Sequence, residues 1–410
     1  MYSMLLFCLL PWLPILGDSK AGSDVVKLTS GQILNGRVLY EGRDELVMKS
    51  GRGEVELARN DVASIRSIER SLAGFIERFD RMPRGNPAAA AELAGWCKNE
   101  DLDNEARNLW LRVLFADPTN EAALKAVGGR HAGKKIQLRD GKRWWDVEEF
   151  RAAKSRWREG VHLSTAHFDI ETDASVDMLL DASVQIERHF LRFYTALGPE
   201  LVLYIFDEFK PRPTIRVYAN AKDFPQSWTG GDNTWFAPSE NVLYVQSGEK
   251  YDMPQMVRAV TDMLLFNACR RSSGKTGQVP GWVASSIGEF FAATAPSLPF
   301  GIWDEFGRPV KSWFKLQAQD PKPIQLKTLL RSSLSEMRRG DDSLRRTAAA
   351  YTLGHFMVRG DNGEHRAAFF QYLRSAWLGR ISSDDFLESI GMSEADLDKR
   401  WRSYVEANAH

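Results

Sequence analysis

Residues 280–291 read PGWVASSIGEFF, and they follow a polar loop, RRSSGKTGQ, at positions 270–278. Before that loop, residues 253–267 read MPQMVRAVTDMLLFN, in which apolar side chains recur at helical spacing. Asp252 supplies an N-cap, and Pro254 stands in the first turn, where its missing N–H costs nothing. We therefore expect two helices here, joined by the loop.

The residues that precede these helices have the pattern of a sheet with a long helix. An amphipathic helix is expected from Ser175 to Leu197. Short strands are expected in HLSTAHFDIET (162–172), LVLYIFD (201–207), TIRVYA (214–219) and VLYVQ (242–246). Further helices are expected beyond position 340, so the sequence predicts an α+β fold.

The run P-G-W-V-x-x-x-I-G-E-F-F, after a helix that ends in LLFN, resembles the gluzincin fold of zinc metallopeptidases. In particular, it is similar to a domain family of unknown function from secreted bacterial proteins. In that family the first helix carries H-E-x-x-H and the second W-L-x-E-G-x-A-E-Y-F, and both His with the first Glu of the second helix hold Zn²⁺. The resemblance covers residues 160–410 and implies a zincin-like domain with a helical C-terminal lobe.

The zinc ligands of that family are missing from this sequence. The aligned positions are Arg258 and Asp262 for the two His, Ala259 for the general base, Ser285 for the glutamate ligand and Glu289 for a second carboxylate. The 7 His of the chain include no H-E-x-x-H and no pair at the i, i+4 spacing of two ligands on one helix face. The resemblance therefore implies a degenerate site, for which we expect no metal and no cofactor.

Two of the replacing residues carry opposite charges. Arg258 and Asp262 are one helical turn apart, which makes their side chains neighbours. We expect them to form an ion pair across the emptied site.

An active hydrolase is the competing interpretation, either as a peptidase with an unrecognised ligand set or as a serine hydrolase. Ala284-x-Ser286-x-Gly288 is similar to the G-x-S-x-G elbow, with His355 as a candidate base. The elbow needs a strand and a sharp turn before the serine, whereas here a Pro-Gly loop precedes it. We therefore expect a non-catalytic module, and Ser286 is the nucleophile of the alternative.

A non-catalytic cleft of this kind is expected to retain recognition of extended polypeptide. In zinc peptidases of this architecture, the strand that borders the active-site helix pairs with the substrate backbone, and main-chain pairing needs no metal. The residues in that place are Val242, Leu243, Tyr244, Val245 and Gln246. The alternative is a structural lobe whose strand edge is covered by the loop Thr229–Thr234 or by another domain. The expected partner is an extended polypeptide or another secreted protein.

The N-terminus predicts export. Residues 1–21 have an apolar run, broken by Pro11 and Pro14, that is followed by small and polar residues, as in a signal peptide, although no Lys or Arg precedes it. We expect a secreted or periplasmic protein with no membrane span after its removal. Cys97 and Cys269 remain in the mature chain, and the sequence leaves their pairing open.

Two further segments precede the zincin-like region. Residues 24–66 alternate apolar and polar side chains in short runs, which predicts about five strands and resembles Sm-like small barrels, with a plain hairpin as the alternative. Residues 71–151 have helical periodicity that resembles paired tetratricopeptide helices, and we expect a helical spacer. Asp146 and Glu149 predict another helix start near Val147.

The composition excludes one class of partner. The 410 residues include 54 Lys plus Arg and 54 Asp plus Glu, so the formal net charge is zero. Proteins that bind nucleic acid without sequence preference rely on a surplus of basic side chains. We therefore expect no nucleic-acid partner.

Overall fold

The computed structural model describes most of the chain. The described residues are 24–51, 53–133, 135–140, 143–152, 161–173, 176–201, 203, 213–225, 233–246, 253–273, 279–293, 310–338, 340–378, 380 and 383–410. The predicted signal peptide lies outside them. None of the described helices has an apolar stretch long enough to cross a membrane.

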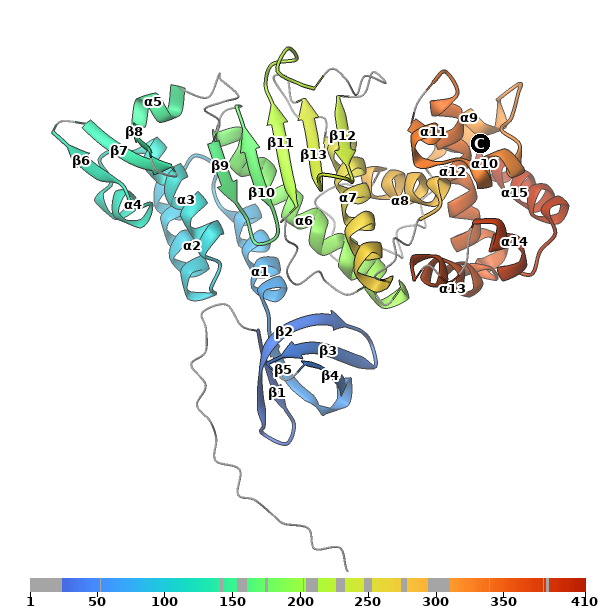
Figure 1. The fold of residues 1–410 in the computed structure, drawn as a ribbon, viewed down its shortest axis with the longest axis horizontal. Coiled ribbons are helices and arrows are strands. Elements are labelled where there is room, and N and C mark those ends of the chain that lie inside the picture. Colours follow the sequence, from blue (N-terminus) through green and yellow to red (C-terminus); the bar gives the residue numbers. More distant parts are fainter. Residues whose placement is uncertain are drawn as a thin grey trace, which may run out of the picture.

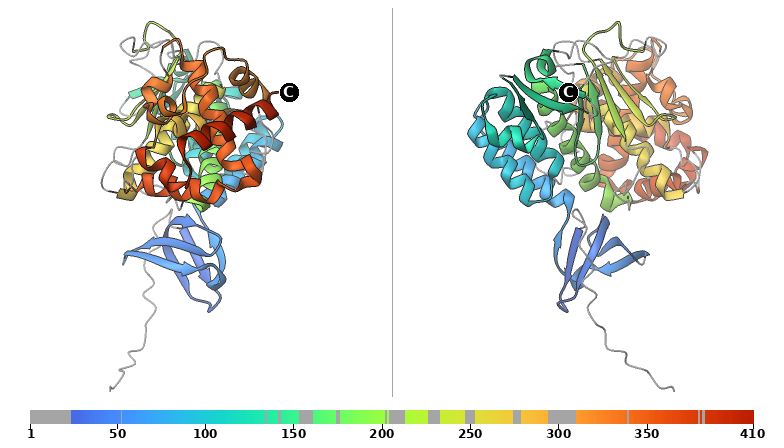
Figure 2. Two further views of the ribbon diagram at one scale, coloured as in Figure 1. Left: turned by 90° about the vertical axis from the view of Figure 1, so that its right-hand side faces the viewer. Right: turned by 60° about the vertical axis from the view of Figure 1, so that its left-hand side comes forward.

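The first element is a five-stranded antiparallel sheet in the order β4-β3-β2-β1-β5. Its strands are β1 (Asp24–Leu28), β2 (Ile33–Glu41), β3 (Glu45–Ser50), β4 (Gly53–Ala58) and β5 (Val62–Arg66). They curl around a small apolar core of their own, formed by Val26, Val38, Leu46, Met48 and Val62. The five predicted strands are confirmed, and the sheet lies at one end of the molecule in every view (Figures 1 and 2).

Four helices follow: α1 (Ile68–Arg81), α2 (Pro87–Asn99), α3 (Asp103–Ala116) and α4 (Glu121–Ala126). The prediction of helix throughout 71–151 is wrong at its end, where β6 (Arg130–Ala132), β7 (Lys135–Asp140) and β8 (Arg143–Asp146) form a three-stranded sheet. The physical reason is local. Gly128 adopts positive φ just after the end of α4, and Gly133 adopts positive φ just after β6. The side chains of Leu138 and Trp145 are buried, so the sheet has an apolar face. The predicted helix start at Val147 is confirmed by α5 (Val147–Ala152).

The central sheet has the strand order β12-β13-β11-β10-β9. Its strands are β9 (Val161–Ser164), β10 (Asp169–Thr172), β11 (Thr214–Tyr218), β12 (Thr234–Ala237) and β13 (Val242–Gln246). β10, β11 and β13 are parallel, whereas β9 and β12 run antiparallel to their neighbours. The helix α6 (Val176–Leu201) forms the crossover from β10 to β11, and of the strand predicted at 201–207 only Leu201 and Leu203 are described.

The prediction of a free edge at Val242–Gln246 is wrong. β13 pairs with β11 on one side and with β12 on the other, so both rows of its backbone groups are used. Short strand β12 was missed because four residues, TWFA, show no usable alternation. It is β12 that ends the sheet, and it lies toward the C-terminal helices in Figure 1.

The remainder of the described chain is helical. It contains α7 (Met253–Ser273), α8 (Gly281–Ala293), α9 (Lys311–Ala318), α10 (Leu326–Arg331), α11 (Leu334–Arg338), α12 (Ser343–Arg359), α13 (Arg366–Trp377), α14 (Phe386–Ser389) and α15 (Glu394–Asn408). α7 packs against β12 and β13, and α8 packs between α7 and α12. Trp282, which is fully buried, stacks on Phe369 at a centroid distance of 5.9 Å. The predicted α+β class and helical C-terminal region are confirmed.

Cys97 is a free thiol in the core of α2, where burial raises its pKa. Cys269 lies in α7, and its side chain is outside the described part of the chain. Packing, rather than a Cys97 disulfide, therefore holds the helical segment together.

Candidate ligand-binding cleft

A cavity of about 240 Å³ lies where α7 and α8 meet the edge of the central sheet and the C-terminal helices. Six elements line it, with Thr234 from β12, Gln255 and Arg258 from α7, Ser285 and Glu289 from α8, Trp313 from α9, Met337 and Arg338 from α11, and Ser343, Leu344 and Thr347 from α12. Three of the five positions aligned with the zinc site of the gluzincin-like family, Arg258, Ser285 and Glu289, therefore line one cavity, whereas Ala259 and Asp262 are not among its lining residues.

An ion pair joins α7 to α8 at the cavity wall. The Nε of Arg258 lies 2.5 Å from Oε1 of Glu289, and Nη2 donates to Oε2 at 3.0 Å. Gly288 lies beside Arg258, and a Cβ at Gly288 would make an ordinary van der Waals contact with the Arg258 backbone at 3.7 Å. The carboxylate is buried, with 6% of its side chain exposed, while 30% of the Arg258 side chain is exposed.

A second ion pair joins α7 to α11. The Nη2 of Arg338 lies 2.6 Å from Oδ2 of Asp262, whose side chain is 6% exposed. Burial raises the pKa of Asp262 to about 6, Arg338 opposes that rise, and the nearby charge of Glu289 adds to it.

The predicted pair between Arg258 and Asp262 is therefore wrong. Each residue has taken a partner from another helix, because a carboxylate on α8 and a guanidinium on α11 reach them with better geometry than the weak Arg-before-Asp arrangement within one helix. The result is two ion pairs between helices, one from α7 to α8 and one from α7 to α11.

These residues do not fit a zinc ion. Zinc takes imidazole, thiolate and carboxylate ligands, whereas two of the aligned positions hold a guanidinium and a methyl group. Ala259 is 2% exposed and packs in the main core, and the carboxylates of Asp262 and Glu289 are already bound to arginines. A cation in this place would be repelled by Arg258 and Arg338.

The alternative nucleophile, Ser286, lies inside helix α8 and is 3% exposed. Its hydroxyl packs against Gly354 of α12, where a Cβ would stand 2.0 Å from Oγ. The candidate base His355 is also buried and shares a hydrogen bond of 2.7 Å between Nδ1 and the Tyr404 hydroxyl. Ser286 therefore does not occupy the exposed strand–turn–helix position that activates such a serine.

Strand β12 brings backbone groups to the same cavity. The N–H of Gln246 donates to the carbonyl of Asn233 at 2.7 Å, and the register pairs Trp235 with Tyr244. In an antiparallel ladder, hydrogen-bonded residues alternate with residues that point away from the partner strand. The N–H and C=O of Thr234 and Phe236 therefore point outward, and no described strand pairs with that side of β12.

A second polar cluster, buried between the N-terminal sheet and the rest of the molecule, was missed by sequence reasoning. The carboxylate of Glu187 accepts from His167 twice, from the backbone N–H at 2.8 Å and from Nδ1 at 2.7 Å. The Nε2 of His167 lies 3.3 Å from Glu69, which is also bound by Arg37 of β2. The imidazole stacks on Phe190 at a centroid distance of 3.6 Å.

The electrostatics of this cluster favour the charged forms of His167 and Glu69. Burial lowers the pKa of His167, but Glu187 and Glu69 overcome it and raise the pKa to about 9. Burial raises the pKa of Glu69, but Arg37 and His167 reverse the shift and bring it to about 2. Both ring nitrogens of His167 are engaged by carboxylates, so the imidazole has no donor left for a substrate. Through these contacts and Arg37, the cluster joins β2, α1 and α6.

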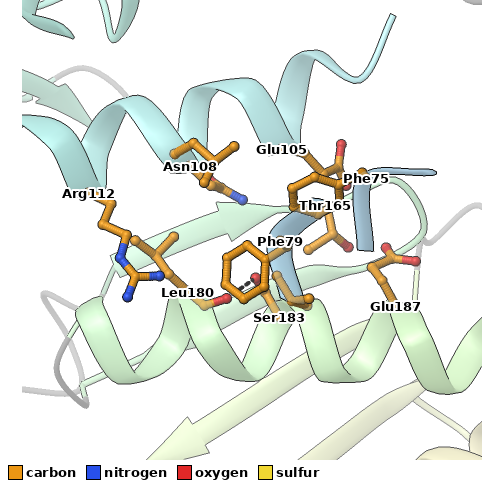
Figure 3. Close-up of a pocket in the computed structure, with 11 residues that line it drawn as sticks. Phe75, Phe79, Glu105, Asn108, Arg112, Thr165, Leu180, Ser183 and Glu187 are labelled. Carbon is orange, nitrogen blue, oxygen red and sulfur yellow. Dashed lines mark hydrogen bonds between the residues drawn. The ribbon is translucent and has the colours of Figure 1, made fainter. Parts of the chain in front are cut away.

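Beside this cluster, Glu105 and Glu187 face a cavity of about 20 Å³ between α1, α3 and α6 (Figure 3). This volume holds about one water molecule. Burial and the charge of Glu187 raise the pKa of Glu105 to about 7, while the Ala166 N–H donates to its carboxylate at 2.7 Å. The cavity is too small for a substrate.

One group of potential cation ligands occurs in the described residues, at Asp361, Glu364 and His365. Arg400 already lies 2.7 Å from Asp361 and 2.9 Å from Glu364. Both carboxylates are therefore already engaged by one guanidinium, and we assign no metal to the group.

No family model and no curated protein matches the chain.

Proposed function

We propose that this protein is a secreted, non-catalytic relative of zinc metallopeptidases that binds extended polypeptide along the outer edge of β12. The observation that carries the proposal is that this edge and the cavity share a residue, Thr234. A peptide that pairs with β12 would therefore place a side chain or its terminus in the cavity.

The loss of catalysis is supported by what stands at the aligned positions. The carboxylates of Asp262 and Glu289 are each held by an arginine, and Ser285 and Ala259 offer neither a metal ligand set nor a general base. Peptide hydrolysis by this fold needs a metal-bound water and a carboxylate that activates it. Nothing in this arrangement supplies either.

Peptide binding is supported by the direction of the β12 backbone. Main-chain groups at an open strand edge bind an added strand by the same hydrogen bonds that form a sheet, and side-chain pockets next to the edge give selectivity. Thr234 and Phe236 present such groups, and their side chains are buried, so the strand is rigid before a peptide arrives.

Two variants at one position test the proposal. Thr234→Pro removes the outward N–H without removing a bond to β13, and Thr234→Ala removes the side-chain hydroxyl and methyl groups but keeps that N–H. Binding of fluorescent extended peptides of six to eight residues, measured by anisotropy, should weaken about tenfold in the Pro variant and little in the Ala variant. Equal binding by both variants, or no binding by the wild type, would exclude recognition at this edge.

Export forms part of the proposal and has its own test. The apolar run in residues 1–21 and the polar residues after it support removal of a signal peptide. N-terminal sequencing of protein recovered from medium or periplasm should begin close to residue 22. An intact Met1 on the exported protein would contradict this.

A further inference from the structure

We infer that the cavity beside β12 is a carboxylate subsite, which takes an acidic side chain or the C-terminal carboxylate of the bound polypeptide through Arg258 and Arg338. The inference rests on the proposed polypeptide binding and names the chemistry that the cleft selects.

The two arginines at the cavity are more exposed to solvent than the carboxylates with which they pair. The side chains of Arg258 and Arg338 are 30% and 27% exposed, whereas those of Glu289 and Asp262 are each 6% exposed. Asp262 does not line the cavity at all. A ligand group that enters therefore meets two guanidiniums before it meets a carboxylate.

Each guanidinium has N–H donors that are not bound to its carboxylate partner. Arg258 donates Nη2 to Oε2 of Glu289, and Nη2 of Arg338 lies 2.6 Å from Oδ2 of Asp262. Within the described part of the chain, the Nη1 group of neither arginine has a partner. A guanidinium carries five N–H donors in a planar fork that suits a carboxylate. Each arginine can therefore stay paired with its buried carboxylate and donate to a second anion.

The remaining wall suits a short aliphatic stem. Trp313, Met337 and Leu344 form apolar surface, and Leu344 is 56% exposed. The volume of about 240 Å³ is below the 300 to 1,000 Å³ typical of sites for whole small molecules. One side chain with a terminal carboxylate, or a chain end, matches this size and polarity.

A cationic side chain fits less well. Its counter-charge would be Glu289, which is buried and already bound by Arg258. It would also approach two guanidiniums, and like charges in a partly buried site repel strongly.

Four matched peptides test the inference and separate the two sources of the carboxylate. They carry Glu or Gln at one position and a free or amidated C-terminus. The wild type should prefer one carboxylate-bearing form by about tenfold. A Glu-over-Gln preference identifies a side chain, and a free-over-amidated preference identifies the chain end.

Variants of Arg338 test whether the preference for a carboxylate arises in the cavity. Arg338→Gln should remove most of it. Because Arg338→Gln leaves Asp262 without its partner, the paired variant Arg338→Gln/Asp262→Asn repeats the test with no unpaired charge, and both are compared after thermal melting shows a folded chain.

The outcomes separate the two proposals. If the wild type binds all four peptides equally, the carboxylate subsite is wrong and polypeptide binding stands. The subsite is also wrong if the preference survives in both Arg338 variants. If no peptide binds at all, both the proposed polypeptide binding and the carboxylate subsite are wrong.

Discussion

Arg258 of α7 and Glu289 of α8 form a two-point ion pair, with 2.5 Å between Nε and Oε1 and 3.0 Å between Nη2 and Oε2. The pair joins two helices at the cavity wall, and its two members differ in exposure. That difference predicts unequal effects of removing them.

Arg258→Met should lower the free energy of unfolding by about 3 kcal/mol, because it leaves the buried Glu289 carboxylate without a counter-charge. Glu289→Gln should cost about 1–2 kcal/mol, since Arg258 is partly exposed and can reach water. Urea denaturation measures both. The double variant Arg258→Met/Glu289→Leu should recover much of the loss, and a double variant as unstable as the sum would contradict this account.

Glu105 predicts a pH dependence of stability. Its pKa rises from 4.5 to about 7 on folding, through burial and the charge of Glu187, so the folded chain keeps a proton that the unfolded chain loses in this range. The free energy of unfolding therefore falls as pH rises from about 4.5 to 7.

Glu105→Gln removes this term and keeps an acceptor for the Ala166 N–H. Relative to wild type, the variant should gain on the order of 2–3 kcal/mol between pH 5 and pH 7.5. The difference cancels other titrating groups, including His167, that both proteins share. Urea denaturation at several pH values checks it, and a difference that stays constant with pH would show that Glu105 does not titrate there.

Zinc should be neither bound nor needed. The aligned positions hold Arg258, Ala259, Asp262 and Ser285, which do not form a zinc ligand set. Elemental analysis of purified protein should find far less than one zinc per chain, and EDTA should leave the melting temperature unchanged. A zinc peptidase treated in parallel is the positive control, and about one tightly held zinc per chain would overturn the prediction.

Gly354→Ala should destabilise the contact between α12 and α8. The added Cβ would stand 2.0 Å from Oγ and 3.0 Å from Cβ of Ser286, inside a buried helix pair, which predicts a loss of about 1–3 kcal/mol.

Two further variants support the assignment of that loss to the contact. Ser286→Ala in combination with Gly354→Ala should recover part of it, because the closest atom is removed. Gly95→Ala in α2 is the matched control, since its Cβ would meet nothing within 4 Å and should raise stability by up to about 1 kcal/mol. Equal effects at Gly95 and Gly354 would exclude the clash.

Much of the local structure could be predicted from the sequence. The helix at Met253 follows from its first-turn proline and apolar spacing, and the strands of 24–66 follow from their alternation and glycine turns. These signals lie within a few residues of each other, so the backbone period and local burial decide them. The β6–β8 sheet and the strand β12 were not predicted, and β6, β8 and β12 have only three or four residues, too few to show an alternation.

Partners across the fold could not be predicted in this way. Arg258 pairs with Glu289, and Asp262 pairs with Arg338. His167 contacts Glu69, a residue 98 positions earlier. The sequence by itself determined which segments become helices and strands, and which charges were available. Only the tertiary structure decided which charges pair and which strand ends the sheet, because an ion pair and a sheet edge depend on how distant elements pack and on how much water they exclude.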